Sequence, residues 1–125
     1  IYTIGFCFGG RISYLQGIRP ELGLTGVIGF YGVPVGGGRA GLPAPVDVAD
    51  RFACPVLAVF GGADPGIPPE ARDTFAYALE AASVPHETVV YEGAPHSFFD
   101  RKAREFADAS ADAWAHVLDF VGATR

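Results

Sequence analysis

The chain has 125 residues, of which 50% are hydrophobic and 18% charged, and its net charge at pH 7 is −5. These values are typical of a folded globular domain rather than a disordered, fibrous or membrane-spanning chain. The acidic balance argues against nucleic acid or an anionic membrane surface as the main partner. The two cysteines, Cys7 and Cys54, form no CxxC motif or Cys/His cluster, so neither a zinc site nor a disulfide framework is predicted.

Short apolar runs alternate along the chain with segments of helical periodicity, and glycine and proline separate them. Strands are expected at residues 1–5, 26–31, 55–60 and 86–91. Helices are expected from Gly10 to about Gly17, from Pro68 or Pro69 through Ala82, and from Lys102 to Val121. A Gly/Pro-rich connection occupies residues 32–45. This order predicts an α/β fold, a mostly parallel sheet with flanking helices, as a single domain over residues 1–125.

The start of the chain is unusual, because residue 1 is Ile and a strand is expected at once. We therefore expect further sequence to precede it in the parent protein, and any targeting segment would lie there. Cysteine usage alone favours a reducing compartment, which gives a cytoplasmic location as the expectation.

Residues able to carry chemistry follow three of the predicted strands. Cys7 follows the first, Asp64 the third and His96 the fourth, in the chain order nucleophile, acid, base. Ligands of open α/β sheets bind beyond the C-terminal ends of the strands, so these side chains are expected to meet at one edge.

The segment from Gly5 to Gly9 has the form of a nucleophile elbow, G-x-S-x-G, with Cys7 in place of serine. We expect both glycines to leave room for neighbouring backbone at a strained strand-to-helix turn. The turn places the sulfur at a helix N-terminus, which favours thiolate over thiol. His96 is the expected base, and the backbone N–H of Phe8 is the expected donor to an oxyanion.

The segments GFCFGG, GGADPGIP and YEGAPHSFFDR, followed by a helix ending near WAHVLDF, resemble the dienelactone hydrolase family of α/β-hydrolases, also called carboxymethylenebutenolidases. The resemblance covers essentially the whole chain. It implies that Cys7 is the nucleophile, His96 the general base and Asp64 the group that orients His96. It also implies hydrolysis of an enol-lactone through an acyl-thioester, with no metal or organic cofactor.

The same resemblance implies that residues 1–125 are the C-terminal part of an α/β-hydrolase domain. The preceding part would then supply the second oxyanion donor, further substrate contacts and a glutamate that partners the resting thiol. We therefore expect the parent protein to be the enzyme and this part alone to be inactive.

Substrate binding is where the chain departs from the family pattern. Family members that take dienelactone place an arginine shortly after the catalytic histidine to hold the substrate carboxylate. Here Asp100 stands where that arginine is expected, and Arg101 follows it. Tyr31, Ser97 and Arg101 are the candidate substrate contacts, and the substrate is a small ester or lactone of open identity.

The same residues exclude some other functions and leave others open. The segment GFCFGG is neither G-x-G-x-x-G nor part of a P-loop, and position 13 is Ser where a cysteine phosphatase needs Arg. A general carboxylesterase or thioesterase of the same fold fits the same residues nearly as well. A non-catalytic protein that binds a small molecule or senses oxidation through Cys7 also stays open. Structural roles are expected for Cys54 and for the Phe98–Phe99 pair, and the sequence does not decide the role of the glycines at 36–38.

Overall fold

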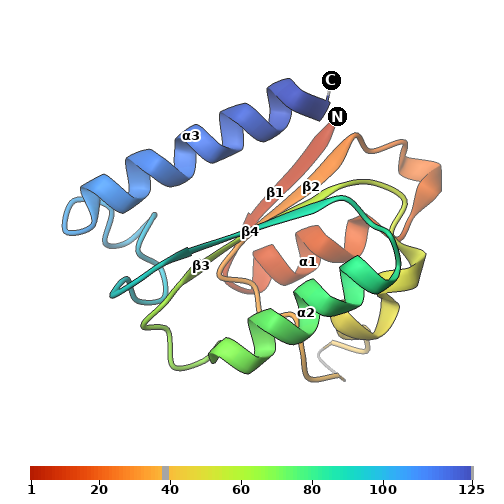
Figure 1. Ribbon diagram of the computed structural model, residues 1–125, viewed down its shortest axis with the longest axis horizontal. Coiled ribbons are helices and arrows are strands. Elements are labelled where there is room, and N and C mark those ends of the chain that lie inside the picture. Colours follow the sequence, from red (N-terminus) through yellow and green to blue (C-terminus); the bar gives the residue numbers. More distant parts are fainter. Residues whose placement is uncertain (38–39, 125) are drawn as a thin grey trace.

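The computed structural model describes residues 1–37 and 40–124 and contains a four-stranded parallel sheet. Its strands are β1 (Tyr2–Phe6), β2 (Gly26–Phe30), β3 (Val56–Gly61) and β4 (His86–Tyr91), in that order across the sheet. Helices α1 (Phe8–Gln16) and α2 (Pro69–Ala81) cover one face, and α3 (Ala107–Thr124) covers the other (Figure 1). The predicted α/β architecture is confirmed.

Burial distinguishes the central strands from the edges. Every residue of β2 and β3 is buried, whereas β1 and β4 mix partly buried and exposed positions. Continuous apolar runs are what a parallel strand needs when helices cover both of its faces. The centre of the core is formed by the large side chains Tyr14, Ile28, Phe30, Leu57, Phe60, Phe75 and Leu79.

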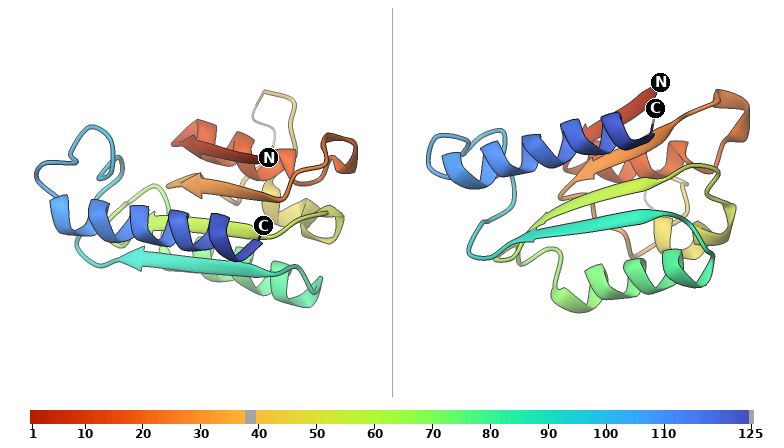
Figure 2. Two further views of the ribbon diagram at one scale, coloured as in Figure 1. Left: turned by 90° about the horizontal axis from the view of Figure 1, so that it is seen from above. Right: turned by 45° about the horizontal axis from the view of Figure 1, so that its top comes forward.

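The last helix runs back along the strands, so that its C-terminal end lies beside the start of β1 (Figure 2). The hydroxyl of Tyr2 donates a hydrogen bond of 2.9 Å to the carbonyl oxygen of Val121 at this place. Among the α3 side chains whose burial the structure describes, Ala113 and Val117 are buried against the sheet. In the part of the chain that the structure describes, no helix is long and apolar enough to cross a membrane.

Two helices begin at different residues from those expected. The first begins at Phe8 and not at Gly10, because Cys7 has a left-handed φ of 57° and turns the chain directly from β1 into α1. The last begins at Ala107 and not at Lys102. The charged segment before it lacks an apolar stripe to bury, and packing is what stabilises most helices in proteins. That segment instead folds into turns, with the N–H of Lys102 bonded to the carbonyl of Ser97 at 3.2 Å.

The connection after β2 is more structured than its composition suggested. It leads into a kinked 3-10 helical segment, η2 (Pro45–Arg51), and a shorter one, η1 (Pro20–Leu22), precedes β2. The guanidinium of Arg11, a residue only 1% exposed, donates to the carbonyl oxygens of Val33 at 3.0 Å and Val35 at 2.7 Å, and to that of Gly36. Position 38 of the three-glycine run lies outside the described residues. A buried cation therefore ties the start of this connection to α1.

Candidate active site

The turn between β1 and α1 presents Cys7 at the C-terminal edge of the sheet. Its backbone N–H donates to the carbonyl of Phe30 at 3.0 Å, which fixes the turn against the end of β2. A Cβ atom on Gly5 would lie 2.0 Å from the carbonyl oxygen of Gly9, so only glycine fits there. The expected role of Gly9 is wrong, because a Cβ on Gly9 would meet nothing within 4 Å. Gly10 is the second constrained position, where a Cβ would lie 2.8 Å from the carbonyl oxygen of Phe30.

A short hydrogen bond joins Asp64 and His96. Nδ1 of His96 lies 2.6 Å from Oδ2 of Asp64, and the N–H of Gly66 donates to Oδ1 at 2.9 Å. The Asp64 side chain is 3% exposed and that of His96 is 39% exposed. A carboxylate only accepts hydrogen bonds, so Nδ1 is the donor in this pair, and in a neutral imidazole the lone pair is then on Nε2. The hydrogen bond to Asp64 therefore selects the tautomer of the neutral imidazole.

The loops after β3 and β4 are held together by backbone contacts. The N–H of Gly62 donates to the carbonyl of Tyr91 at 2.7 Å, and that of Ala63 donates to Ala94 at 2.9 Å. A Cβ on Gly61 would lie 2.4 Å from the carbonyl oxygen of Ala94. The close approach of the two loops, which requires glycine here, sets the distance between Asp64 and His96.

The thiol lies beside the loop that carries His96. Sγ of Cys7 is 3.4 Å from Oγ of Ser97, the residue after the histidine. Ser97 is buried and has a left-handed φ of 63°, which aims its side chain back at the elbow. The Cys7 thiol therefore forms a hydrogen bond with Ser97, and the His96 imidazole forms one with Asp64. The fold brings the three expected catalytic side chains to one sheet edge.

Tyr31 follows β2 at the same edge and is fully buried. Its ring centroid is 5.0 Å from that of His96, and its φ is 41°. In residues 1–37 and 40–124 its hydroxyl makes no well-formed hydrogen bond, although the Asp100 carboxylate lies close to it. Burial first, and then the charge of Asp100, raise the pKa of Tyr31, so the phenol is neutral at physiological pH.

The remaining expected residues occupy exposed positions. Arg101 is exposed, and its backbone N–H donates to Oδ1 of Asp100. Within the described residues its guanidinium forms no ion pair. Phe8 is the first residue of α1, so its N–H has no acceptor inside the helix and is free to serve an oxyanion. The roles of Arg101 and Phe8 stay predictions.

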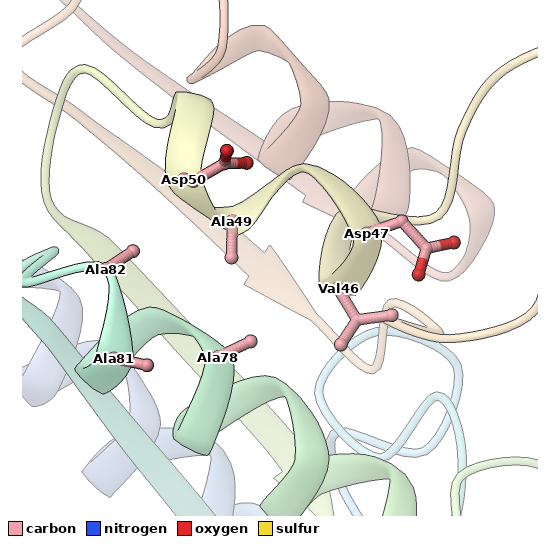
Figure 3. A pocket seen from close by; sticks show the side chains of 7 residues that line it. All are labelled: Val46, Asp47, Ala49, Asp50, Ala78, Ala81 and Ala82. Atoms are coloured by element: carbon pink, nitrogen blue, oxygen red, sulfur yellow. The ribbon is translucent and has the colours of Figure 1, made fainter.

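A separate cavity of about 270 Å³ lies between η2 and α2, away from these residues (Figure 3). The methyl group of Ala49 points from η2 toward α2, while the carboxylates of Asp47 and Asp50 point away from the alanines (Figure 3). Its lining holds these two carboxylates but no Ser, Cys or His side chain. No group of three or more His, Cys, Asp or Glu side chains in the described part of the chain is arranged to hold a metal ion.

Two supporting residues were not identified from the sequence. Gly66 bonds to Asp64, and the run Asp-Pro-Gly is typical of a turn in which Asp accepts from the second residue after it. The Asp-Pro-Gly run in the sequence is therefore enough to predict the hydrogen bond from Gly66 to Asp64. Asp100 lies beside Tyr31 only because the segment after His96 folds into turns, and no local pattern indicates that.

The sheet, the elbow and the loop residues together define an α/β fold of the α/β-hydrolase type. The model of the dienelactone hydrolase family matches residues 1–124, and the chain belongs to that family. A Yersinia pestis protein named "Putative carboxymethylenebutenolidase" is 40% identical, covering 93% of this chain and 44% of its own length. A Methylorubrum extorquens protein of the same name is 39% identical over 93% of this chain and 40% of its own length.

Solved structures agree with this assignment. One from Klebsiella pneumoniae, titled as a "Putative Dienelactone Hydrolase", superposes with a TM-score of 0.83 at 32% identity, over 95% of this chain and 50% of that one. A dienelactone hydrolase-like promiscuous phosphotriesterase from metagenomic libraries gives 0.74 at 27% identity, over 97% and 51%. The chain spans less than half the length of these curated relatives.

Proposed function

We propose that the full-length protein carrying this chain hydrolyses a small ester or lactone, with Cys7 as nucleophile, His96 as general base and Asp64 as the residue that orients His96. One observation carries the proposal: the 2.6 Å hydrogen bond between His96 and Asp64 lies at the sheet edge where the elbow presents Cys7. Membership of the dienelactone hydrolase family supports the same reaction class. Asp64 is buried and accepts a second hydrogen bond, so it holds the imidazole in one tautomer.

Acylation begins with transfer of the thiol proton to Nε2 of His96 while Sγ forms a bond to the carbonyl carbon. The carbonyl oxygen becomes an oxyanion, and the Phe8 N–H donates a hydrogen bond to it. A second donor is expected from sequence outside residues 1–125. Collapse of the tetrahedral adduct breaks the bond to the leaving oxygen, which takes the proton from His96. A thioester on Cys7 remains.

Deacylation uses the same base. Nε2 takes a proton from water as the water oxygen attacks the thioester carbonyl, and collapse breaks the carbon–sulfur bond. The proton then returns to Sγ, so the balance is one ester and one water converted to one acid and one alcohol. The Ser97 hydroxyl must release the thiol at the start of the cycle, and hydrogen bonds of sulfur are weak enough to allow this.

The test assays the full-length protein and its Cys7→Ala, His96→Ala and Asp64→Asn variants on a panel of dienelactone, simple aryl esters and thioesters. Cys54→Ala is the matched control, because Cys54 is buried among core side chains. We expect turnover to disappear without Cys7 or His96, to fall sharply in Asp64→Asn and to persist in the control. The panel separates a lactone hydrolase from a carboxylesterase or thioesterase. Turnover that survives loss of Cys7 overturns the proposal.

The hydrogen bond between Cys7 and Ser97 favours one alternative, in which Cys7 is a redox-sensing thiol. Oxidation of a sensor thiol to sulfenic acid by peroxide does not require an ordered Asp–His pair. The rate of Cys7 oxidation by hydrogen peroxide should then be the same in His96→Ala and in the wild type, and ester hydrolysis should be absent. A hydrolase gives the opposite pair of results.

A further inference from the structure

The backbone of Tyr31 is fixed directly after β2. Its N–H donates to the carbonyl oxygen of Val59 in the neighbouring strand β3 at 2.7 Å. Gly32 follows, and a Cβ there would lie 2.5 Å from the backbone nitrogen of Arg11, so only glycine fits against the start of α1. Tyr31 has a left-handed φ of 41°, which is unfavourable for a bulky side chain. Such a conformation persists only where the surrounding contacts impose it, and it is most common at functional sites.

The ring of Tyr31 joins the elbow strand to the loop that carries His96. Its centroid lies 6.3 Å from that of Phe6, at the end of β1, and 5.7 Å from that of Phe98 in an edge-to-face arrangement. It also lies 5.0 Å from the centroid of the His96 imidazole, with 53° between the two planes. The two phenylalanine contacts lie within the separation at which aromatic rings attract one another. Because the side chain is fully buried, close packing holds this ring in one place.

His96 needs a contact of this kind, because one hydrogen bond does not fix the orientation of a ring. Nδ1 is held 2.6 Å from Oδ2 of Asp64, but that bond alone leaves the imidazole free to turn about it. The side chain is 39% exposed, so part of the ring faces solvent. Turning about Nδ1 moves Nε2, the atom that takes the proton from Cys7 in the proposed reaction. The buried Tyr31 ring beside the imidazole limits this movement.

The hydroxyl group of Tyr31 is not needed for this contact. Within residues 1–37 and 40–124 the hydroxyl oxygen is buried and makes no well-formed hydrogen bond. The packing against His96 therefore depends on the aromatic ring. A side chain that is fully buried presents no surface to a substrate, so an effect of Tyr31 on turnover has to act through the residues that it touches.

We propose that Tyr31 is a positioning residue, whose ring packs beside the imidazole and keeps Nε2 of His96 directed at the Cys7 thiol. The inference rests on the proposed function, in which His96 is the base. It gives Tyr31 a role other than the substrate contact expected from the sequence. Asp64 selects the tautomer of His96, and Tyr31 sets the plane of its ring.

The test measures kcat and KM for 4-nitrophenyl butanoate in the full-length protein with two substitutions of Tyr31. Tyr31→Phe keeps the ring and removes the hydroxyl, whereas Tyr31→Leu removes the ring. Phe75→Leu is the matched control, because Phe75 is 1% exposed and packs against Tyr14, between α1 and α2. Circular dichroism shows whether each variant folds. If Tyr31→Leu does not fold, Tyr31→Met replaces it, because the flexible methionine side chain fills irregular gaps.

We expect kcat to fall roughly 10- to 100-fold in Tyr31→Leu with KM within about threefold of the wild type, because a misplaced base slows both acylation and deacylation. Tyr31→Phe and Phe75→Leu should each keep kcat within about twofold of the wild type. In an Asp64→Asn background, Tyr31→Leu should lower kcat by less than about threefold, since both residues act on the same imidazole.

Several results overturn this inference alone, provided that the wild type shows Cys7-dependent hydrolysis. They are an unchanged kcat in Tyr31→Leu, equal losses in Tyr31→Phe and Tyr31→Leu, and a similar loss in Phe75→Leu. A raised KM with unchanged kcat would make Tyr31 a substrate contact instead. Fully additive losses in the double variant with Asp64→Asn would show that Tyr31 does not act through His96. Absence of Cys7-dependent hydrolysis in the wild type overturns the proposed function and the role of Tyr31 with it.

Discussion

Replacing Gly5 by alanine should destabilise the protein far more than the same change at Gly9. A Cβ on Gly5 would lie 2.0 Å from the carbonyl oxygen of Gly9, whereas ordinary contact begins at 3.4 Å. The backbone of β1 and the first turn of α1 would have to separate by most of the difference, 3.4 − 2.0 = 1.4 Å. Overpacking against side chains costs about 1–3 kcal/mol, and backbone yields less readily, so we expect about 3 kcal/mol or more.

Gly9 is the matched control, because it lies in the same turn and a Cβ there meets nothing within 4 Å. Alanine is favoured over glycine in helices, so Gly9→Ala should be neutral or stabilise the protein by up to about 1 kcal/mol. Gly5→Ala should also remove ester hydrolysis, since it displaces Cys7.

The assay is urea unfolding of the full-length protein, followed by circular dichroism, with comparison of midpoints and slopes. The reasoning is refuted if the two variants lose similar stability, or if Gly5→Ala lowers the free energy of unfolding by less than about 1 kcal/mol.

Three further predictions concern single side chains. Alkylation with iodoacetamide at pH 7.5, followed by peptide mass spectrometry, should modify Cys7 well before Cys54, because Cys54 is 7% exposed and burial raises its pKa; faster modification of Cys54 would contradict the burial. Asp64→Asn should lower kcat by roughly 100- to 10,000-fold, since an amide no longer holds the imidazole in the required tautomer; a loss below tenfold would mean that the hydrogen bond is dispensable. Arg11→Met should lower the free energy of unfolding in urea by about 3 kcal/mol, because the buried guanidinium donates to three carbonyls. Arg19→Met, at an exposed position, should lower it by less than about 0.5 kcal/mol. Equal losses in the two variants would contradict a stabilising role of the buried Arg11 guanidinium.

The strands were the most predictable part of the fold. Runs such as GVIGF and VLAVF are apolar throughout, and only a central parallel strand or a buried helix accommodates such a run. Length and the flanking glycine and proline favour the strand. Because Cys7, Asp64 and His96 each follow a strand, parallel pairing is enough to bring them to one edge.

Contacts that depend on tertiary packing were not predictable. Gly9 matches the elbow pattern, yet the close contacts with backbone occur at Gly5 and Gly10, and only the path of the chain decides which glycine is crowded. The residues before Ala107 have helical composition, but they lack a face to bury. The hydrogen bond between Cys7 and Ser97 depends on the left-handed turn at residue 97, which propensity does not favour for serine.

The most direct test of the central claim is to find where the acyl group goes during turnover. The full-length protein would be mixed with 4-nitrophenyl acetate, quenched in acid within one turnover and digested for mass spectrometry. The account predicts one acetyl group on the peptide that contains Cys7, present in Cys54→Ala and absent in Cys7→Ala. Hydrolysis with the acetyl group on another residue, or undiminished hydrolysis in Cys7→Ala, would contradict it.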